Sequence, residues 1–171
     1  MEPTIRRATA ADLDFIADTW IRNYAQSVAV RQMRRTMYFD EQRVVMNSIL
    51  SEALQAGGAY VACDPGGEDV LWGWIAGSPG TIHYVFVKTS FRGHGIGRKL
   101  MEIFETPSQG TVITHWPPEA HGSKDWTRAW IFKHVDNGRF LYNPYRAMRY
   151  GAISLEAAER GWNARGQKKA G

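Results

Sequence analysis

The chain is poor in cysteine, with Cys63 alone among its 171 residues. A single thiol cannot close a disulfide within the chain, so packing must hold the fold, and the reducing cytoplasm is the expected location. Long apolar runs are also missing, because residues 70–87, the longest stretch without a charged side chain, are interrupted by glycines, a proline and a histidine. This stretch predicts strands and a turn instead of a membrane span, and the N-terminus lacks a secretory signal.

Positive charge is missing from residues 44–87, which hold four acids and no lysine or arginine. The cations that give the chain its formal net charge of +4 are concentrated instead at residues 31–35, 88–99 and 124–149. The middle cluster flanks a run of glycines. Positive charge beside a flexible backbone favours an anionic ligand over a neutral one.

Apolar residues are plentiful, at 44% of the chain, which is enough to build the packed core of one domain. We expect this domain to span residues 1–162 and a polar tail to follow at 163–171. Thr9 to Asp12 form a capping box that predicts a helix start, and Asp40 predicts a second one. Apolar residues at helical spacing follow both, and Gly57–Gly58 would end the second helix.

The apolar pattern changes to short β-rich runs after the second predicted helix. Residues 82–88 alternate between two faces, with His83, Val85 and Val87 on one and Ile82, Tyr84 and Phe86 on the other. Both faces are mostly apolar, which predicts a central strand. The predicted strands are residues 4–8, 59–63, 70–76, 82–88 and 111–116, with 139–145 extended, and further helices are expected at 96–104, 123–135 and 155–162.

A strand, a glycine turn, a helix and a further strand follow one another from residue 82 to residue 116. This order predicts a βαβ unit with two parallel strands. Because the earlier strands are joined by short turns typical of hairpins, the sheet should be mixed. We therefore expect an α/β (α+β) fold, a single domain with a mixed central sheet and flanking helices.

The glycine run itself reads Arg92-Gly93-His94-Gly95-Ile96-Gly97. Glycines let a backbone approach a phosphate closely, and a helix start offers unpaired N–H groups. The spacing does not match the dinucleotide fingerprint, because the third glycine comes one residue early. It does not match a Walker loop either, because Gly97 is followed by Arg98-Lys99-Leu100. The segment thus predicts an anion-binding loop of another kind.

The segment resembles motif A of the GCN5-related N-acetyltransferase (GNAT) superfamily, in which Gln or Arg is followed by two residues, Gly, one residue, and Gly or Ala. The resemblance implies a GNAT-like sheet with splayed parallel strands at 82–88 and 111–116. It also implies acetyl-CoA as acyl donor, with its pyrophosphate on the loop amides and its pantetheine arm along the preceding strand. The implied cofactor-binding residues are Phe86, Val87, Lys88, Arg92, Gly93, His94, Gly95, Ile96, Gly97 and Arg98.

Acyl transfer to an amine requires a neutral nucleophile, stabilisation of an oxyanion and protonation of the departing thiolate. In this family a backbone N–H of the pantetheine strand meets the oxyanion, which implies Phe86 or Val87 here. Many relatives carry a glutamate base on that strand, but this chain has none between residues 69 and 102. His83 and His115 are the candidate bases in its place.

The family often supplies the acid as a tyrosine after the last helix, and the local candidates are Tyr142, which we favour, and Tyr145. The asparagine and tyrosine spacing usual for that helix is absent from residues 123–135. No metal site is predicted, because the histidines and Cys63 form none of the spacings of metal ligands.

The acceptor pocket of this family is built from the first helices and the C-terminal strands. Here that implies a wall from Asn23, Tyr24, Arg31, Tyr38 and residues 116–145, aromatic and basic in character. Such a wall suits a planar or acidic acceptor. We expect a small-molecule or peptide amine, a monomer or homodimer, and no membrane partner.

Two alternatives remain open from the residues. Aromatic side chains interleaved with cations over 124–149 are also typical of nucleic-acid binding, so the acceptor could be a nucleic acid or a modified nucleobase. The missing strand glutamate is compatible with a non-catalytic module that only binds acyl-CoA.

Overall fold

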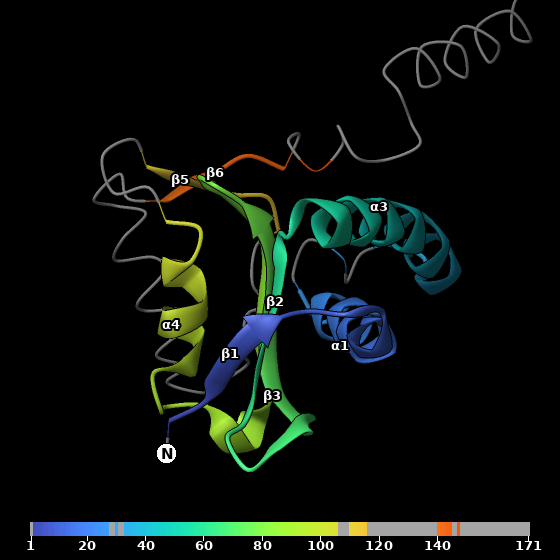
Figure 1. Ribbon diagram of the computed structural model, residues 1–171. Helices are drawn as coiled ribbons and strands as arrows, with labels where there is room; N and C mark the ends of the chain where they lie inside the picture. Colours follow the sequence, from blue (N-terminus) through green and yellow to red (C-terminus); the bar gives the residue numbers. More distant parts are fainter. Residues whose placement is uncertain are drawn as a thin grey trace, which may run out of the picture.

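The computed structural model describes residues 2–27, 30, 33–105, 110–115, 140–144 and 147. In this part of the chain, six strands form one sheet in the order β1-β2-β3-β4-β5-β6 (Figure 1). The strands are β1 (Thr4–Arg7), β2 (Ala59–Asp64), β3 (Gly67–Ser78), β4 (Thr81–Val87), β5 (Thr111–Ile113) and β6 (Phe140–Tyr142). The first four are antiparallel, whereas β4–β5 and β5–β6 are parallel. The mixed sheet confirms the predicted fold class.

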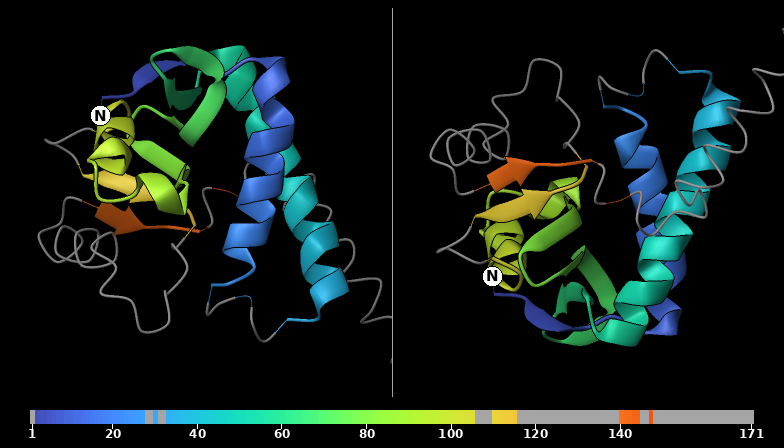
Figure 2. Two further views of the ribbon diagram at one scale, coloured as in Figure 1. Left: turned by 90° about the horizontal axis from the view of Figure 1, so that it is seen from below. Right: turned by 90° about the horizontal axis from the view of Figure 1, so that it is seen from above.

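Helices cover both faces of this sheet. α4 (Ile96–Glu102) packs on one face, while α1 (Leu13–Tyr24) and α3 (Arg35–Ala56) lie side by side on the other (Figures 1 and 2). Short 3₁₀ turns η1 (Ala10–Asp12) and η2 (Thr89–Phe91) precede α1 and follow β4. The sheet therefore separates two apolar cores, one under each helical layer.

The capping box that the sequence predicts lies at the start of η1, the turn that leads into α1. The Thr9 N–H and hydroxyl donate to a carboxylate oxygen of Asp12 over 2.7 and 2.9 Å, and the Arg6 guanidinium donates to the same carboxylate over 2.8 and 3.0 Å. Although burial alone would raise the pKa of Asp12, these hydrogen bonds outweigh it and hold the pKa below its ordinary value of 3.8. Asp12 therefore ties β1 to the start of α1.

This lowered pKa makes stability depend on pH. The ionised Asp12 stabilises the fold above pH 3.8, and we expect that contribution to disappear as the pH falls through the lower folded-state pKa. Asp12→Asn should therefore be less stable than wild type at pH 7, with a difference that shrinks towards pH 2. Urea denaturation across this range measures the effect, and a difference independent of pH would contradict it.

The second long helix begins earlier than predicted. α3 starts at Arg35, after Arg34 in extended conformation, and not at Asp40. Tyr38, in its first turn, is buried and its hydroxyl donates to the carbonyl of Ile21 on α1 over 2.8 Å. This tertiary contact stabilises a helical turn that lacks a side-chain cap. The predicted end is confirmed, because Gly57 adopts a left-handed conformation with φ of 70°.

The sheet contains a bulge at the place that matters most for the site. On β3, Ala76 and Gly77 are neighbours, but their partners on β4 are Tyr84 and Ile82, so His83 is an extra residue. Consequently Ile82 packs with Val85 and Val87 in the core under α4, whereas Tyr84 and Phe86 face α1. The strict alternation predicted for residues 82–88 is therefore wrong at Ile82, because the bulge shifts the register.

The central position of β4 and its parallel pairing with β5 are both confirmed. Several predictions concern residues that lie outside the described part of the chain. They are the helices at 123–135 and 155–162, the tail at 163–171, the strand end at Trp116, the candidate acid Tyr145, and Arg31 with most of residues 116–145 in the acceptor wall. In the part of the chain that is described, none of the helices has the length and apolarity needed to span a membrane.

Candidate functional site

The parallel strands β4 and β5 are in register at only two positions. Thr81 and Ile82 pair with Val112 and Ile113, and the ladder closes with a 3.1 Å hydrogen bond from the Thr114 N–H to the Ile82 carbonyl. The bulge at His83 comes next, and a bulge bends a strand and increases its twist. Beyond it, no described strand pairs with the β5 side of β4. In the described part of the chain, the β4–β5 ladder therefore ends at the bulge, where the resemblance implies a splay.

One hydrogen bond shows which backbone groups of β4 point to its β5 side, where no described strand pairs with it beyond the bulge. The Lys88 N–H donates to the Trp72 carbonyl over 2.8 Å, so Lys88 faces β3, and Phe86 faces it by the antiparallel alternation. Val85 and Val87 point their N–H and C=O groups the other way. Of the two amides proposed to meet the oxyanion, the one of Val87 thus lies on the open side.

The glycine loop begins after η2, at the end of β4. Gly93 and Gly95 have φ values of 82° and 77°, and a Cβ added at either would meet no atom within 4 Å. Within the described residues, the backbone N–H groups of residues 93–98 have no hydrogen-bond acceptor. The loop therefore combines a conformation that favours glycine with open space and a row of unpaired donors.

The cations around this loop have partners in the protein. Arg92 Nε donates to the Val87 carbonyl over 3.0 Å, and the Lys88 ammonium lies 4.8 Å from the ring centre of Phe15. Arg98 and Lys99 form exposed ion pairs with Glu102 and Glu2. Exposed pairs of this kind contribute about 0–1 kcal/mol, so a more highly charged anion at the loop can displace them.

The two candidate bases, His83 and His115, meet at one hydroxyl group. Both are buried, and their Nδ1 atoms lie 3.0 and 2.9 Å from Thr114 Oγ1. His115 Nε2 lies 3.1 Å from the side-chain nitrogen of Gln42 on α3. Burial, together with neighbouring His83, lowers the pKa of His115 to about 3. His115 is therefore neutral at pH 7, whereas the ordinary imidazole pKa of 6.5 lies close to that pH.

The candidate acid Tyr142 lies on β6, in register with Ile113 of β5 and, across it, with Ile82 of β4. Its side chain is 45% exposed, and partial burial raises its pKa. Burial, with a smaller contribution from Tyr142, raises the pKa of Tyr24 to about 12. Both hydroxyls are therefore protonated at neutral pH and able to donate. Tyr142 lies level with the point where β4 and β5 separate.

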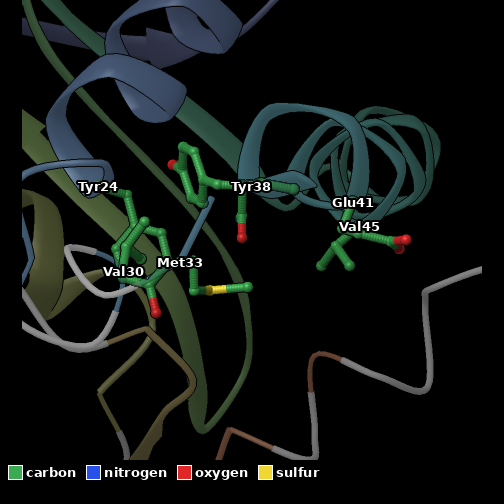
Figure 3. Close-up of a pocket in the computed structure, with 7 residues that line it drawn as sticks. Tyr24, Val30, Met33, Tyr38, Glu41 and Val45 are labelled. Carbon is green, nitrogen blue, oxygen red and sulfur yellow. The ribbon is translucent and has the colours of Figure 1, made fainter. Parts of the chain in front are cut away.

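A pocket of about 190 Å³ opens beside these residues, between the end of α1 and the first turns of α3. Figure 3 shows Tyr24 and Val30 on one side of it and Glu41 and Val45 on the other. Tyr24 also packs its ring 4.9 Å from that of His115. The lining residues are Tyr24, Val30, Met33, Tyr38, Glu41, Gln42 and Val45.

Two of the residues predicted for the acceptor wall, Tyr24 and Tyr38, line this pocket. Asn23, a third, is not in its lining, and its side-chain oxygen accepts a 2.6 Å hydrogen bond from the Tyr84 hydroxyl. Glu41 is the only charged side chain among the described residues that line this pocket, whereas Arg22 and Arg35 line an adjoining pocket of about 470 Å³ that shares Val30, Met33 and Tyr38 with it. Gln42 and Thr114 were missed because neither belongs to a recognisable motif.

Among the described residues, no group of three or more His, Cys, Asp or Glu side chains could hold a metal ion.

Comparisons with known proteins give matches among solved structures alone: no family model and no curated protein matches. Apo-form YjaB from Escherichia coli is 21% identical, with a TM-score of 0.48 over 79% of this chain and 82% of that one. A structure of histone acetyltransferase HPA2 and related acetyltransferase from Corynebacterium glutamicum is 21% identical, with a TM-score of 0.48 over 60% and 70% of the two chains. A GNAT superfamily phosphinothricin acetyltransferase from Sinorhizobium meliloti, in complex with AcCoA, is 22% identical, with a TM-score of 0.41 over 61% and 58%.

Proposed function

We propose that the chain is an N-acetyltransferase of the GNAT superfamily that transfers an acetyl group from acetyl-CoA to an amine. One observation carries the proposal: the β4–β5 ladder ends at a bulge, no described strand pairs with that side of β4 beyond it, and β4 runs into a loop of left-handed glycines. An extended ligand arm can add to such an edge through backbone hydrogen bonds. The loop at the end of the edge suits the anionic group that such a ligand carries.

The residues present fit the parts of acetyl-CoA one by one. The N–H groups of residues 93–98 would bind the diphosphate, and Arg98 and Lys99 add positive charge beside them. Val85 and Val87 would pair with the pantetheine arm along the open edge of β4. From Ile82 to Lys88 that strand extends about 20 Å, at roughly 3.3 Å per residue. The thioester would then lie near the bulge, level with Tyr142 and the two histidines.

In the proposed reaction the amine attacks the thioester carbonyl directly, in a ternary complex. A C–N bond forms, the C–S bond breaks, and one proton leaves the amine while one joins the thiolate. With the thioester near the bulge, the Val87 N–H would lie about 13 Å away, at roughly 3.3 Å per residue, so it would serve the pantetheine arm and not the oxyanion. Among the described residues, His83 and His115 are the imidazoles that meet at the bulge. The pocket lined by Tyr24 and Tyr38 would hold the acceptor.

Calorimetry with acetyl-CoA, followed by an acceptor screen that monitors release of free thiol, tests the proposal. We expect saturable binding and thiol release with at least one class of amine. Binding without thiol release from any amine or nucleic-acid acceptor would favour the acyl-CoA-binding module. Absence of binding would contradict the proposed site.

Tyr142→Phe tests the proposed acid. Because the hydroxyl would act only on the departing thiolate, its removal should lower kcat at least about tenfold and leave the KM for acetyl-CoA unchanged. Tyr60→Phe is a matched control, because Tyr60 packs against Phe104 on the α4 side of the sheet. Equal kcat values for the wild type and Tyr142→Phe would remove Tyr142 from the mechanism.

A further inference from the structure

A chain of hydrogen-bonding side chains runs from the bulge of β4 to the acceptor pocket. It starts at His83, passes through Thr114 and His115 after β5, and ends at Gln42, which lines the pocket from α3. The link to Gln42 joins positions 73 residues apart in the sequence. The roles of the ring nitrogens depend on the tautomers, and the Gln42 amide nitrogen, which only donates, gives the starting point for inferring them.

The order begins at Gln42, whose side-chain nitrogen faces His115. An amide nitrogen donates hydrogen bonds and does not accept them, so His115 Nε2 must be the acceptor over this 3.1 Å contact. Since burial keeps His115 neutral, its one ring proton then belongs to Nδ1. That N–H points at Thr114 Oγ1, 2.9 Å away. Because His115 accepts a hydrogen bond from Gln42, it donates one to Thr114.

Thr114 has a single hydroxyl proton and two neighbouring acceptors on His83. The ring nitrogen Nδ1 lies 3.0 Å from Oγ1, and the main-chain oxygen lies 3.4 Å from it. The hydrogen bond to the main-chain oxygen is the longer of the two and lies beyond the usual length of about 2.5–3.0 Å, so we infer that the ring nitrogen takes the proton. With Nδ1 accepting, His83 carries its own proton on Nε2.

We propose that Gln42, acting through His115 and Thr114, fixes the tautomer of His83 so that His83 presents an N–H donor at Nε2. This inference rests on the proposed function for its role in the reaction: His83 acts as a hydrogen-bond donor at the point where β4 and β5 separate, and not as the base. Gln42, Thr114 and His115 are then positioning residues. Gln42, which lines the proposed acceptor pocket, thus determines which ring nitrogen of His83 carries the proton.

The tautomers can be measured directly by long-range ¹H–¹⁵N correlation spectra of the histidine rings in the ligand-free chain, assigned with His83→Gln and His115→Gln variants. We expect the proton on Nδ1 of His115 and on Nε2 of His83. Gln42→Glu, measured at pH 8 where the carboxylate is ionised, replaces the donor by an acceptor. We expect it to reverse both tautomers. Gln42→Met removes the amide donor, so each histidine ring should populate both tautomers.

Thr114→Val tests whether Gln42 acts on His83 through the Thr114 hydroxyl or acts on each histidine separately. In the Gln42→Glu/Thr114→Val double variant, His115 should still reverse while His83 no longer follows. The inference is overturned if His83 carries its proton on Nδ1 in the wild type, or if its tautomer stays unchanged in Gln42→Glu. Because these spectra need neither acetyl-CoA nor turnover, this failure is distinct from that of the proposed function. If Gln42→Glu reverses the tautomers but leaves kcat unchanged, the donor role of His83 in transfer is overturned.

Discussion

Replacing Gly95 by glutamate should raise the Kd for acetyl-CoA at least about 100-fold, a change of about 2.7 kcal/mol. Gly95 caps α4 with a φ of 77°, and the space beside it is open to a ligand. A glutamate there would place a carboxylate where the proposed diphosphate lies, and like charges repel. The left-handed conformation adds a cost of about 1–2 kcal/mol for a residue with a side chain. Calorimetry measures the affinity.

Gly57→Glu is the matched control for this substitution. Gly57 ends α3 with a φ of 70°, so the same residue meets the same backbone strain. Its Cβ would lie beside the guanidinium of Arg7, away from the glycine loop. We expect both variants to lose similar stability and only Gly95→Glu to lose affinity. Equal Kd values for the two variants would remove the loop from the binding site.

Gly73→Ala should destabilise the fold by about 3 kcal/mol, because it overfills the contact between β3 and β4. An alanine Cβ at this position would lie 2.5 Å from the Phe86 carbonyl oxygen and 3.2 Å from Val87 Cα. Both are backbone atoms, so the neighbouring strand must move to relieve the overlap. That movement displaces the edge proposed to hold the pantetheine arm, so affinity for acetyl-CoA should fall as well.

Gly67→Ala provides the comparison on the same strand. A Cβ there would have its nearest neighbour, Val70 Cγ2, at an ordinary distance of 3.7 Å. Its stability should stay within about 0.5 kcal/mol of the wild type. Urea denaturation gives both values through the midpoint and the slope. If the two alanine variants are equally stable, the close approach of β3 and β4 at Gly73 does not constrain β4.

Local signals in the sequence predicted the parts of the fold that depend on neighbouring residues. Thr9 and Asp12 cap a helix, Gly57 ends one, and the glycines after β4 adopt the conformation that favours this residue. The central position of β4 followed from its two apolar faces. In each case the physical cause lies within a few positions along the chain, so a single sequence contains it.

The bulge at His83 could not be predicted, because it is a property of the pairing between β3 and β4. The start of α3 was also missed, since it depends on the bond from Tyr38 to Ile21 on another helix. Gln42 and Thr114 join the site through contacts across distant segments. The partners of the cations, such as Glu2 for Lys99, likewise depend on the folded arrangement. Motif and spacing therefore identified the glycine loop, but they could not predict which side chains surround it in the folded chain.

Titration of the ¹⁵N-labelled chain with acetyl-CoA, followed by backbone amide spectra, tests the central claim most directly. We expect the amide signals of residues 93–98, Val85 and Val87 to shift saturably. The amide of Lys88, which already donates to the Trp72 carbonyl, should keep that hydrogen bond and exchange slowly throughout. Saturable binding that leaves the signals of residues 93–98 and Val87 in place would contradict the proposed site.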